Sequence, residues 1–247
     1  MLKKIVVNGA CGRMGREVVK TVVNETDDLL VGVCDNNNIG DLLETIKETK
    51  PDVIIDFTTP SVVMENIRIG LRNGVNMIVG TTGITDVDLK SIEKMTEENN
   101  VNALIVPNFA VGAILMMRFA AEAAKYLDSV EIIELHHDQK VDAPSGTAVK
   151  TADLINKNRK KYNDKKVQEI EKLTGARGAD ADGIKIHSVR LPGLVAHQEV
   201  IFGAQGQSLL IKHDSYNRKS FMPGVRLALQ KINNISGLVY GLEKLLD

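Results

Sequence analysis

Two adjacent histidines, a lysine and a serine–glycine–threonine turn lie close together in ELHHDQKVDAPSGTA, residues 134–148. An imidazole titrates at about pH 6.5, so His136 or His137 can exchange a proton at physiological pH. Lys140 adds a fixed positive charge with hydrogen-bond donors. Ser145-Gly146-Thr147 is typical of a helix start, whose free N–H groups and hydroxyls can bind a carboxylate. Together these residue types predict a site for a small anion that exchanges a proton during a reaction.

Two other interpretations of the histidine pair stay open at this point. A shared metal ion is disfavoured, because adjacent residues on a strand point to opposite faces and no Cys or carboxylate stands at a ligand spacing. Both histidines could instead satisfy ordinary core or surface contacts. On a continuous strand Glu134 and His136 would share one face, and His137 would lie on the other. Both imidazoles can line one pocket only if the strand ends at about residue 135 or 136, as we predict.

A second motif, NGACGRMG (8–15), follows the first predicted strand. Its glycines Gly9, Gly12 and Gly15 have the spacing GxxGxxG rather than the common GxGxxG. Such a turn lets the backbone approach a pyrophosphate, and the next helix offers free N–H groups and the positive end of its dipole. A plain glycine turn is the alternative for this motif alone. Asp35 favours the dinucleotide interpretation, because an acid at the end of the second strand can bind ribose hydroxyls.

Short apolar segments alternate with helical patterns in the first part of the chain, which predicts a parallel sheet covered by helices on both faces. The predicted strands are 3–8, 29–34, 52–57, 75–80 and 102–107, and the predicted helices are 13–25, 39–49, 60–73 and 85–98. Small polar residues follow three strand ends, at 56–59, 80–83 and 107–109. That edge of an open α/β sheet is where ligands bind.

The pattern changes after residue 107, where strands begin to alternate between polar and apolar residues. Helices are predicted at 112–127, 145–160, 218–232 and 236–246, strands at 130–135, 184–190, 197–204 and 208–213, and a polar loop within 156–166. The predicted fold class is therefore α/β. An N-terminal doubly wound Rossmann-type parallel sheet is followed by a C-terminal α+β substrate domain with a mixed, open sheet.

Composition excludes several classes of protein. The formal charge of −1 over 247 residues disfavours nucleic acid or an anionic membrane as a partner. No apolar run approaches the roughly 20 residues that span a bilayer, and the apolar part of MLKKIVVNGACG is too short for a secretion signal. Cys11 and Cys34 suggest no disulfide framework, which favours the reducing cytoplasm.

The segment EIIELHHDQKVDAPSGTA (131–148) resembles the signature of the 4-hydroxy-tetrahydrodipicolinate reductases, the dihydrodipicolinate reductases of bacterial lysine and diaminopimelate synthesis. Other blocks resemble the family in the same order, so that the similarity covers essentially the whole chain. These blocks are GACGRMG (9–15), DFT (56–58), GTTG (80–83), PNFAVG (107–112), GARGADADGIKIHSVRLPG (175–193) and HDSYNRKSFMPG (213–224).

The resemblance implies an enzyme that reduces 4-hydroxy-tetrahydrodipicolinate, a cyclic imino dicarboxylate, to tetrahydrodipicolinate with NADH or NADPH and loss of water. It implies that His136 and Lys140 transfer protons. The substrate-binding residues that it implies are His137, Lys140, Ser145, Gly146 and Thr147. The cofactor-binding residues that it implies are Gly9, Ala10, Cys11, Gly12, Arg13, Met14, Asp35, Thr58, Gly80, Thr81, Thr82, Pro107, Asn108, Phe109 and Ala110.

The resemblance also implies a domain plan. Residues 1–107 and 217–247 would form the dinucleotide-binding domain, and 108–216 the substrate-binding and oligomerisation domain of a homotetramer. With cofactor and substrate on different domains, we expect closure about hinges near 107–112 and 213–218.

Two departures from the family pattern concern the cofactor. Residues 36–51 are a shorter segment than in many members, and Asn36 stands where an arginine often follows the acid. An acid at position 35 with no neighbouring Arg or Lys repels a 2′-phosphate and binds the ribose hydroxyls. We therefore expect NADH to be preferred over NADPH.

Two rival functions stay open: an NAD(P)-dependent dehydrogenase of another small dicarboxylic or amino acid, and a non-catalytic regulator that senses NAD(H). The paired histidines with Lys140 and the Ser-Gly-Thr turn argue against the first, and the regulator needs neither a lysine beside two histidines nor a carboxylate-binding turn. We expect His187, His197 and His213 to be structural. Lys212 and Arg218 are weaker candidates for substrate or domain contacts.

Overall fold

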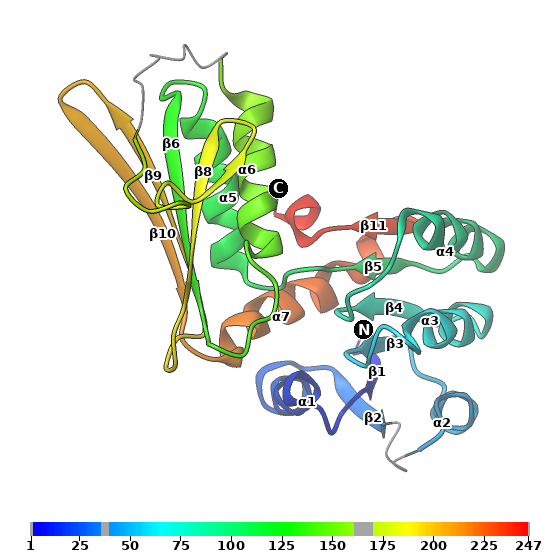
Figure 1. The fold of residues 1–247 in the computed structure, drawn as a ribbon. Helices are drawn as coiled ribbons and strands as arrows, with labels where there is room; N and C mark the ends of the chain where they lie inside the picture. Colours follow the sequence, from blue (N-terminus) through cyan, green and yellow to red (C-terminus); the bar gives the residue numbers. More distant parts are fainter. Residues whose placement is uncertain (1, 36–39, 161–169, 247) are drawn as a thin grey trace. The chain divides into compact units, whose positions relative to one another are not determined.

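Segments rich in Val, Ile and Leu build a six-stranded sheet in the order β11-β5-β4-β3-β1-β2, with every pair of neighbours parallel (Figure 1). The computed structural model describes residues 2–35, 40–160 and 170–246. The strands of this sheet are β1 (Lys4–Asn8), β2 (Leu29–Cys34), β3 (Val53–Asp56), β4 (Asn76–Val79), β5 (Ala103–Ile105) and β11 (Leu238–Tyr240). Ile54 and Ile55 are neighbours on β3 and both are fully buried. Burial on both faces explains why these strands are continuously apolar.

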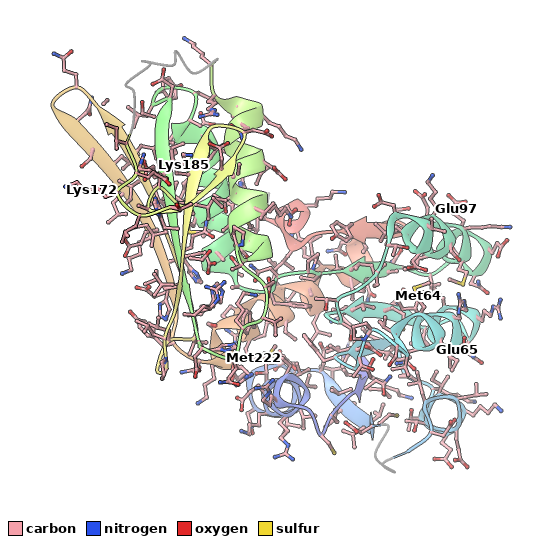
Figure 2. The ribbon with its side chains drawn as sticks, viewed as in Figure 1. Met64, Glu65, Glu97, Lys172, Lys185 and Met222 are labelled. Carbon is pink, nitrogen blue, oxygen red and sulfur yellow. The ribbon has the colours of Figure 1, made fainter. Side chains whose placement is uncertain are left out.

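Helices cover both faces of this sheet (Figure 1). One layer contains α2 (Leu42–Thr49), α3 (Val63–Arg72) and α4 (Asp86–Asn99), and the other contains α1 (Arg13–Glu25) and α7 (Met222–Lys231). Ile67, Leu71 and Ile92 of the first layer pack into one apolar cluster with the sheet. Met222, labelled in Figure 2, begins α7 and is buried. The doubly wound parallel sheet predicted from the sequence is confirmed.

The end of the chain differs from its prediction. The segment 236–246, predicted as a helix, forms strand β11 and then a short 3₁₀ helix, Leu242–Leu245. Gly237 and Gly241 bracket β11 with positive φ angles of 65° and 93°, which interrupt a helix, and β11 pairs with β5. The helix predicted at 218–232 begins with a 3₁₀ turn, Arg218–Phe221, before α7.

The second sheet has five strands in the order β10-β9-β6-β8-β7. Its strands are β6 (Ser129–His136), β7 (Ala179–Ala181), β8 (Ile184–Arg190), β9 (Ala196–Ala204) and β10 (Gln207–Ser215). Only the β6–β8 pair is parallel among these described strands, so the sheet is mixed, as predicted. Helices α5 (Val111–Ala123) and α6 (Gly146–Asn158) lie on one side of it (Figure 1). Val130, Ile132 and Glu134 are buried on β6, and the residues between them are partly exposed.

The chain divides into two compact units. The first consists of Met1–Val111 and Arg218–Asp247, and the second of Gly112–Asn217. Asn36, where the sequence departs from the family pattern, lies outside the described residues, as does part of the predicted polar loop 156–166. In the part of the chain that is described, no helix is long and apolar enough to cross a membrane.

Candidate functional site

In the second unit, β6 ends at His136, which confirms the predicted end of the strand. Glu134 and His136 share one face of β6, because residues two apart on a strand point the same way. Nδ1 of His136 lies 2.5 Å from Oε2 of Glu134. His137 follows the strand with an exposed side chain, in backbone that is no longer β-structure.

Arg190 reaches the same carboxylate from the neighbouring strand. β6 and β8 run parallel with His136 in register with Arg190. Nη1 and Nη2 of Arg190 donate hydrogen bonds to Oε2 and Oε1 of Glu134 at 2.9 and 2.7 Å. The backbone N–H of Ser145 donates a further bond to Oε1 at 3.2 Å. Because the Glu134 side chain is 0% exposed, its charge depends on these partners for stabilisation.

Burial and these partners shift two pKa values. Burial raises the pKa of Glu134, but the hydrogen bonds from Arg190, Ser188 and His136 outweigh it and hold the pKa below its ordinary value. Burial lowers the pKa of His136; Glu134 opposes this effect, while Lys140 and Arg190 add to it, and the net shift is downward. His136 is therefore neutral at neutral pH. Since an ionised carboxylate only accepts hydrogen bonds, Nδ1 carries the proton and Nε2 can act as an acceptor.

Lys140 lies in the turn after β6, where its N–H donates to the carbonyl of His137 at 3.2 Å. Its Nζ forms an ion pair with Oδ1 of Asp142 at 2.6 Å, and this hydrogen bond holds the pKa of Asp142 below its usual value. Nη2 of Arg190 also donates to the carbonyl of Asp142 at 2.8 Å. Arg190 thus links the loop that carries Lys140 to the carboxylate that contacts His136.

Helix α6 begins directly after this loop. Ser145 is its N-cap, and Oγ of Ser145 accepts a hydrogen bond from the N–H of Ala148 at 3.2 Å. The N–H groups of Gly146 and Thr147 belong to the first turn, where a helix supplies no internal acceptor. No acidic residue stands in this turn, so the helix start can receive a carboxylate. The Ser145 hydroxyl accepts one bond as a cap and keeps its own proton for donation.

The structure thus joins most of the predicted residues through groups that the sequence did not single out. Glu134 contacts both His136 and Ser145, and Arg190 connects Glu134 to the Lys140 loop. The shared face of Glu134 and His136 was a local signal for the first of these residues. Arg190 carries no local signal, because the parallel β6–β8 pairing brings it to the site from far along the chain.

In the first unit, the glycine turn meets the end of β3. Gly9 has φ +80°, and a Cβ there would lie 2.5 Å from the carbonyl oxygen of Phe57. A Cβ on Gly15 would lie 2.0 Å from the carbonyl oxygen of Gly9, so the helix and the turn pack too closely for any side chain. Gly12 is the N-cap of α1, with no side-chain cap and no acidic residue in the first turn. The uncapped N–H groups suit an anion.

A buried carboxylate, which the sequence did not assign, organises the carboxyl edge of this sheet. Asp56 is 0% exposed and accepts hydrogen bonds from the side-chain amides of Asn8 and Asn66, each at 2.9 Å. It also accepts bonds from the hydroxyls of Thr58 and Thr81, each at 2.8 Å. Asp56 therefore fixes two threonines of the predicted cofactor site relative to each other.

A cavity of about 340 Å³ opens at this edge. It is lined by Gly12, Arg13, Met14, Phe57, Thr58, Pro60, Gly80, Thr81, Thr82 and Arg218. Seven predicted cofactor residues are among them; Arg218, a weaker candidate for other contacts, also lies here. The predicted residues outside this lining are Gly9, Ala10, Cys11, Asp35, Pro107, Asn108, Phe109 and Ala110.

Several of these outer residues contact the cavity wall or the glycine turn. Oδ2 of Asp35 accepts a hydrogen bond from the N–H of Cys11 at 2.9 Å, so the acid lies beside the turn. The Phe57 and Phe109 rings lie 5.3 Å apart. The Phe57 ring packs on Gly80, where a Cβ would be 2.2 Å from Cε1. This arrangement can hold an extended anionic ligand along the glycine turn.

The remaining histidines make other contacts in the second unit. His187 and His197 each lie 2.8 Å from a carboxylate, Glu131 and Asp214 respectively. Lys212 pairs with Glu199 at 2.9 Å. Within residues 2–35, 40–160 and 170–246, no group of three or more His, Cys, Asp or Glu is arranged to hold a metal ion.

Two family models match almost the whole chain. The model described as "Dihydrodipicolinate reductase, N-terminus" matches residues 3–109, and "Dihydrodipicolinate reductase, C-terminus" matches residues 112–246. A 4-hydroxy-tetrahydrodipicolinate reductase of Listeria welshimeri is 52% identical, with 99% of this chain and 100% of that protein covered. An enzyme of the same name from Syntrophomonas wolfei is 48% identical, with 98% of each chain covered.

Solved structures give the same result. The dipicolinate-bound dihydrodipicolinate reductase from Paenisporosarcina sp. TG-14 has a TM-score of 0.89 and 47% identity, with 100% of both chains covered. An amine dehydrogenase from Mycobacterium smegmatis has a TM-score of 0.67 at 12% identity, with 98% of this chain and 95% of that chain covered. The second likeness is one of fold alone.

Proposed function

The chain belongs to the dihydrodipicolinate reductase family, and we propose that it reduces 4-hydroxy-tetrahydrodipicolinate to tetrahydrodipicolinate, with loss of water. The observation that carries this proposal is the network in the second unit that links His136, the Lys140 loop and the start of α6 through one buried carboxylate. Such a network combines a proton-exchanging group with a place for a carboxylate. A reductase of a cyclic dicarboxylate needs both.

His136 and Lys140 handle the protons of the proposed reaction. Loss of the hydroxyl group as water takes up a proton at oxygen and releases one from the neighbouring ring carbon, and addition of a hydride to the ring is completed by a further proton. Lys140 is a cation with protons to give. The neutral His136 ring has a lone pair on Nε2 and can accept a proton there and return it. General acid–base groups of this kind contribute about 10²–10⁴-fold to a rate.

The substrate carboxylates are held by the start of α6 and by the segment that follows β6. The N–H groups of Gly146 and Thr147, with the Ser145 hydroxyl, offer donors at the positive end of α6. His137 is exposed and Lys140 is partly exposed in the segment after β6. Two anchored carboxylates would fix the ring relative to His136, which is how an enzyme converts an encounter into an oriented reaction.

The cofactor is a nicotinamide dinucleotide, which supplies the hydride when bound. The residues of this chain that fit it are the glycine turn, whose tight packing excludes side chains at Gly9 and Gly15, and the uncapped start of α1. We propose NADH as the preferred form, because the Asp35 carboxylate beside Cys11 would repel a 2′-phosphate. Specificity constants for the two cofactors test this: a preference for NADPH of about tenfold or more would refute it.

Assembly and location extend the proposal. On the face opposite α6, Leu210 is exposed and pairs with Ile201, which like Ile133 is only partly buried; these apolar side chains support this face as the contact surface of a homotetramer. Cys11 and Cys34 are free thiols, which supports a location in the reducing cytoplasm.

The two connections between the units, near 107–112 and 213–218, are the hinges about which the domains would close for hydride transfer.

A coupled assay tests the reaction. The substrate is made fresh in the cuvette from its precursors, and NADH oxidation is followed. The proposal predicts oxidation that requires the dipicolinate precursor. A dehydrogenase of another acid would instead oxidise NADH with that acid's oxidised form, and a regulator would bind NADH without turnover. Either of these outcomes would refute the proposed function.

A further inference from the structure

Glu134 is the most buried charged residue of the second unit's network, yet it is not among the groups that exchange protons or bind the substrate carboxylates. Its side chain is 0% exposed, so it lies beneath the surface that a substrate can reach. Each of its two carboxylate oxygens receives at least two hydrogen bonds. Oε2 accepts from His136 and Arg190, and Oε1 accepts from Arg190 and the N–H of Ser145.

We propose that Glu134 is a positioning residue for the proposed reaction: it holds the His136 imidazole with its proton on Nδ1 and fixes that ring relative to the carboxylate-binding start of α6. The inference rests on the proposed function only for the roles of His136 in proton exchange and of the α6 start in carboxylate binding. The geometry itself stands on the four hydrogen bonds. Arg190 supports the positioning role of Glu134, because its charge keeps the buried carboxylate ionised.

The tautomer follows from the chemistry of the partners. An ionised carboxylate has no proton to give, so the 2.5 Å contact requires Nδ1–H to be the donor. A neutral imidazole has one N–H, and its other nitrogen, Nε2, then carries a lone pair. Without Glu134 both tautomers become accessible, and the rings that carry their proton on Nε2 could not accept one there. A buried acid that orients a histidine in this way increases turnover without touching the substrate.

The same carboxylate sets the distance between two parts of the site. His136 lies at the end of β6, and Ser145 begins α6 after an intervening loop. The Ser145 N–H bond to Oε1 places the helix start beside the strand end. Arg190 strengthens this link, because its Nη2 bridges Glu134 and the carbonyl of Asp142 within the loop. The proton-exchanging ring and the carboxylate-binding turn therefore move together.

The charged groups around His136 come from three segments. Glu134 lies on its own strand, Arg190 lies on β8, and Lys140 lies in the following turn, where Asp142 pairs with it. Glu134 raises the pKa of His136, whereas Lys140 and Arg190 lower it. Replacing Glu134 by a neutral residue of the same size therefore shifts the His136 pKa downward, in addition to freeing the tautomer.

A first test reads the tautomer in the unchanged protein, and a variant serves only to assign the signals. ¹⁵N NMR of the histidine rings, with the His136 signals assigned by their loss in His136→Ala, reports which nitrogen is protonated. We expect a protonated Nδ1 and an unprotonated Nε2 above the pKa. A proton on Nε2, or a ring that averages between the two tautomers, would overturn the inference. This readout holds whether or not the chain reduces the proposed substrate.

A second test compares two carboxylates of the same strand. Glu134→Gln puts an amide NH₂ where donors already point, whereas Glu131→Gln alters a carboxylate that contacts His187 on the other face. We expect Glu134→Gln to lower kcat by about 10²-fold and to move the His136 limb of the pH–rate profile to lower pH. NADH binding should be retained. Glu131→Gln should keep kcat within about twofold of wild type.

The outcomes separate the inference from the proposed function. Wild-type protein that fails to oxidise NADH with the substrate refutes the function, and the NMR result still decides the tautomer. An active wild type with a Glu134→Gln variant of unchanged kcat and pH profile refutes the positioning role. A variant that loses kcat with an unmoved pH profile and a retained tautomer would reduce Glu134 to a structural residue and likewise refute it.

Discussion

Strand β6 carries a glutamate on each of its faces, and each glutamate binds one histidine and one arginine. On the face toward α6, Glu134 contacts Nδ1 of His136 at 2.5 Å and Nη2 of Arg190 at 2.7 Å. On the opposite face, Glu131 contacts Nε2 of His187 at 2.8 Å and Nη2 of Arg177 at 2.5 Å. The residue types and distances are nearly the same in the two clusters.

Burial and neighbours distinguish the two clusters. The side chain of Glu134 is 0% exposed, whereas that of Glu131 is 37% exposed. Arg177 holds the pKa of Glu131 below its usual value mainly through a hydrogen bond. Only the cluster of Glu134 adjoins a helix start, at Ser145. The comparison teaches that a histidine, a carboxylate and an arginine become a candidate active site through the anion-binding groups next to them.

The largest difference in turnover is expected between variants of the lysines near the two clusters. Lys140 pairs with Asp142 at 2.6 Å, and Lys185, labelled in Figure 2, pairs with Asp180 at 3.1 Å. Lys140→Ala should lower turnover about 10³-fold, because it removes a proton donor and a carboxylate ligand. NADH binding should stay near wild type. Steady-state kinetics and a fluorescence titration with NADH measure both quantities.

The matched variant Lys185→Ala should leave turnover within about twofold, since an exposed ion pair contributes at most about 1 kcal/mol. Equal turnover in Lys140→Ala and wild type would remove Lys140 from the mechanism. Loss of NADH binding in Lys140→Ala would place the cofactor site elsewhere.

The next largest difference is expected in the free energy of unfolding when each of the two glutamates is replaced by alanine. Glu134→Ala leaves Arg190 partly buried without its carboxylate, which costs about 3 kcal/mol or more in the free energy of unfolding. Glu131→Ala, at an exposed site screened by solvent, should cost about 1 kcal/mol or less. Urea denaturation at neutral pH measures both. Equal losses in the two variants would contradict the difference that burial implies.

The two histidines should differ in turnover. His136→Gln should lower kcat about 10²-fold, because glutamine cannot exchange the proton. His187→Gln should change kcat by no more than about twofold. The kinetic assay with freshly made substrate compares the two variants directly. A larger loss of kcat in His187→Gln than in His136→Gln would contradict this account, because it would place the chemistry on the opposite face of β6.

A smaller effect should appear in the pH dependence of stability. Burial lowers the pKa of His136 from 6.5 in the folded protein, so the unfolded chain binds more protons between the folded pKa and 6.5. The free energy of unfolding therefore falls as the pH falls through this window. His213, whose pKa burial also lowers, adds to the same decline.

His136→Gln removes the part of this decline that His136 contributes. Urea midpoints at about pH 7 and about pH 5.5 should therefore differ less in this variant than in wild type. An unchanged difference between the two pH values would mean that the pKa of His136 is not lowered by folding.

Sequence reasoning found the parts of the molecule that local rules specify. Continuous apolar segments predicted the parallel strands, and the glycine turn and the end of β6 at His136 followed from backbone geometry. It did not find what distant pairing creates. Arg190 reaches Glu134 only because β8 pairs with β6 in one register. The segment 236–246 contains good helix formers, but Gly237, Gly241 and a partner in β5 make part of it the strand β11.

The candidate site shows the same division. The types and spacing of His136, Lys140 and Ser145 predicted a proton-exchanging anion site from one short segment. The buried acids that organise the two halves were harder to find, because their importance lies in the number of donors that folding brings to them. Glu134 had only the face that it shares with His136 as a signal, and Asp56 was not singled out.

A crystal structure with NADH and pyridine-2,6-dicarboxylate, a planar mimic of the substrate, tests the central claim most directly. The account predicts one carboxylate of the mimic at the N–H groups of Gly146 and Thr147, the other near Lys140, and the ring beside Nε2 of His136. A dicarboxylate bound instead at the cluster of Glu131, His187 and Arg177 would contradict it.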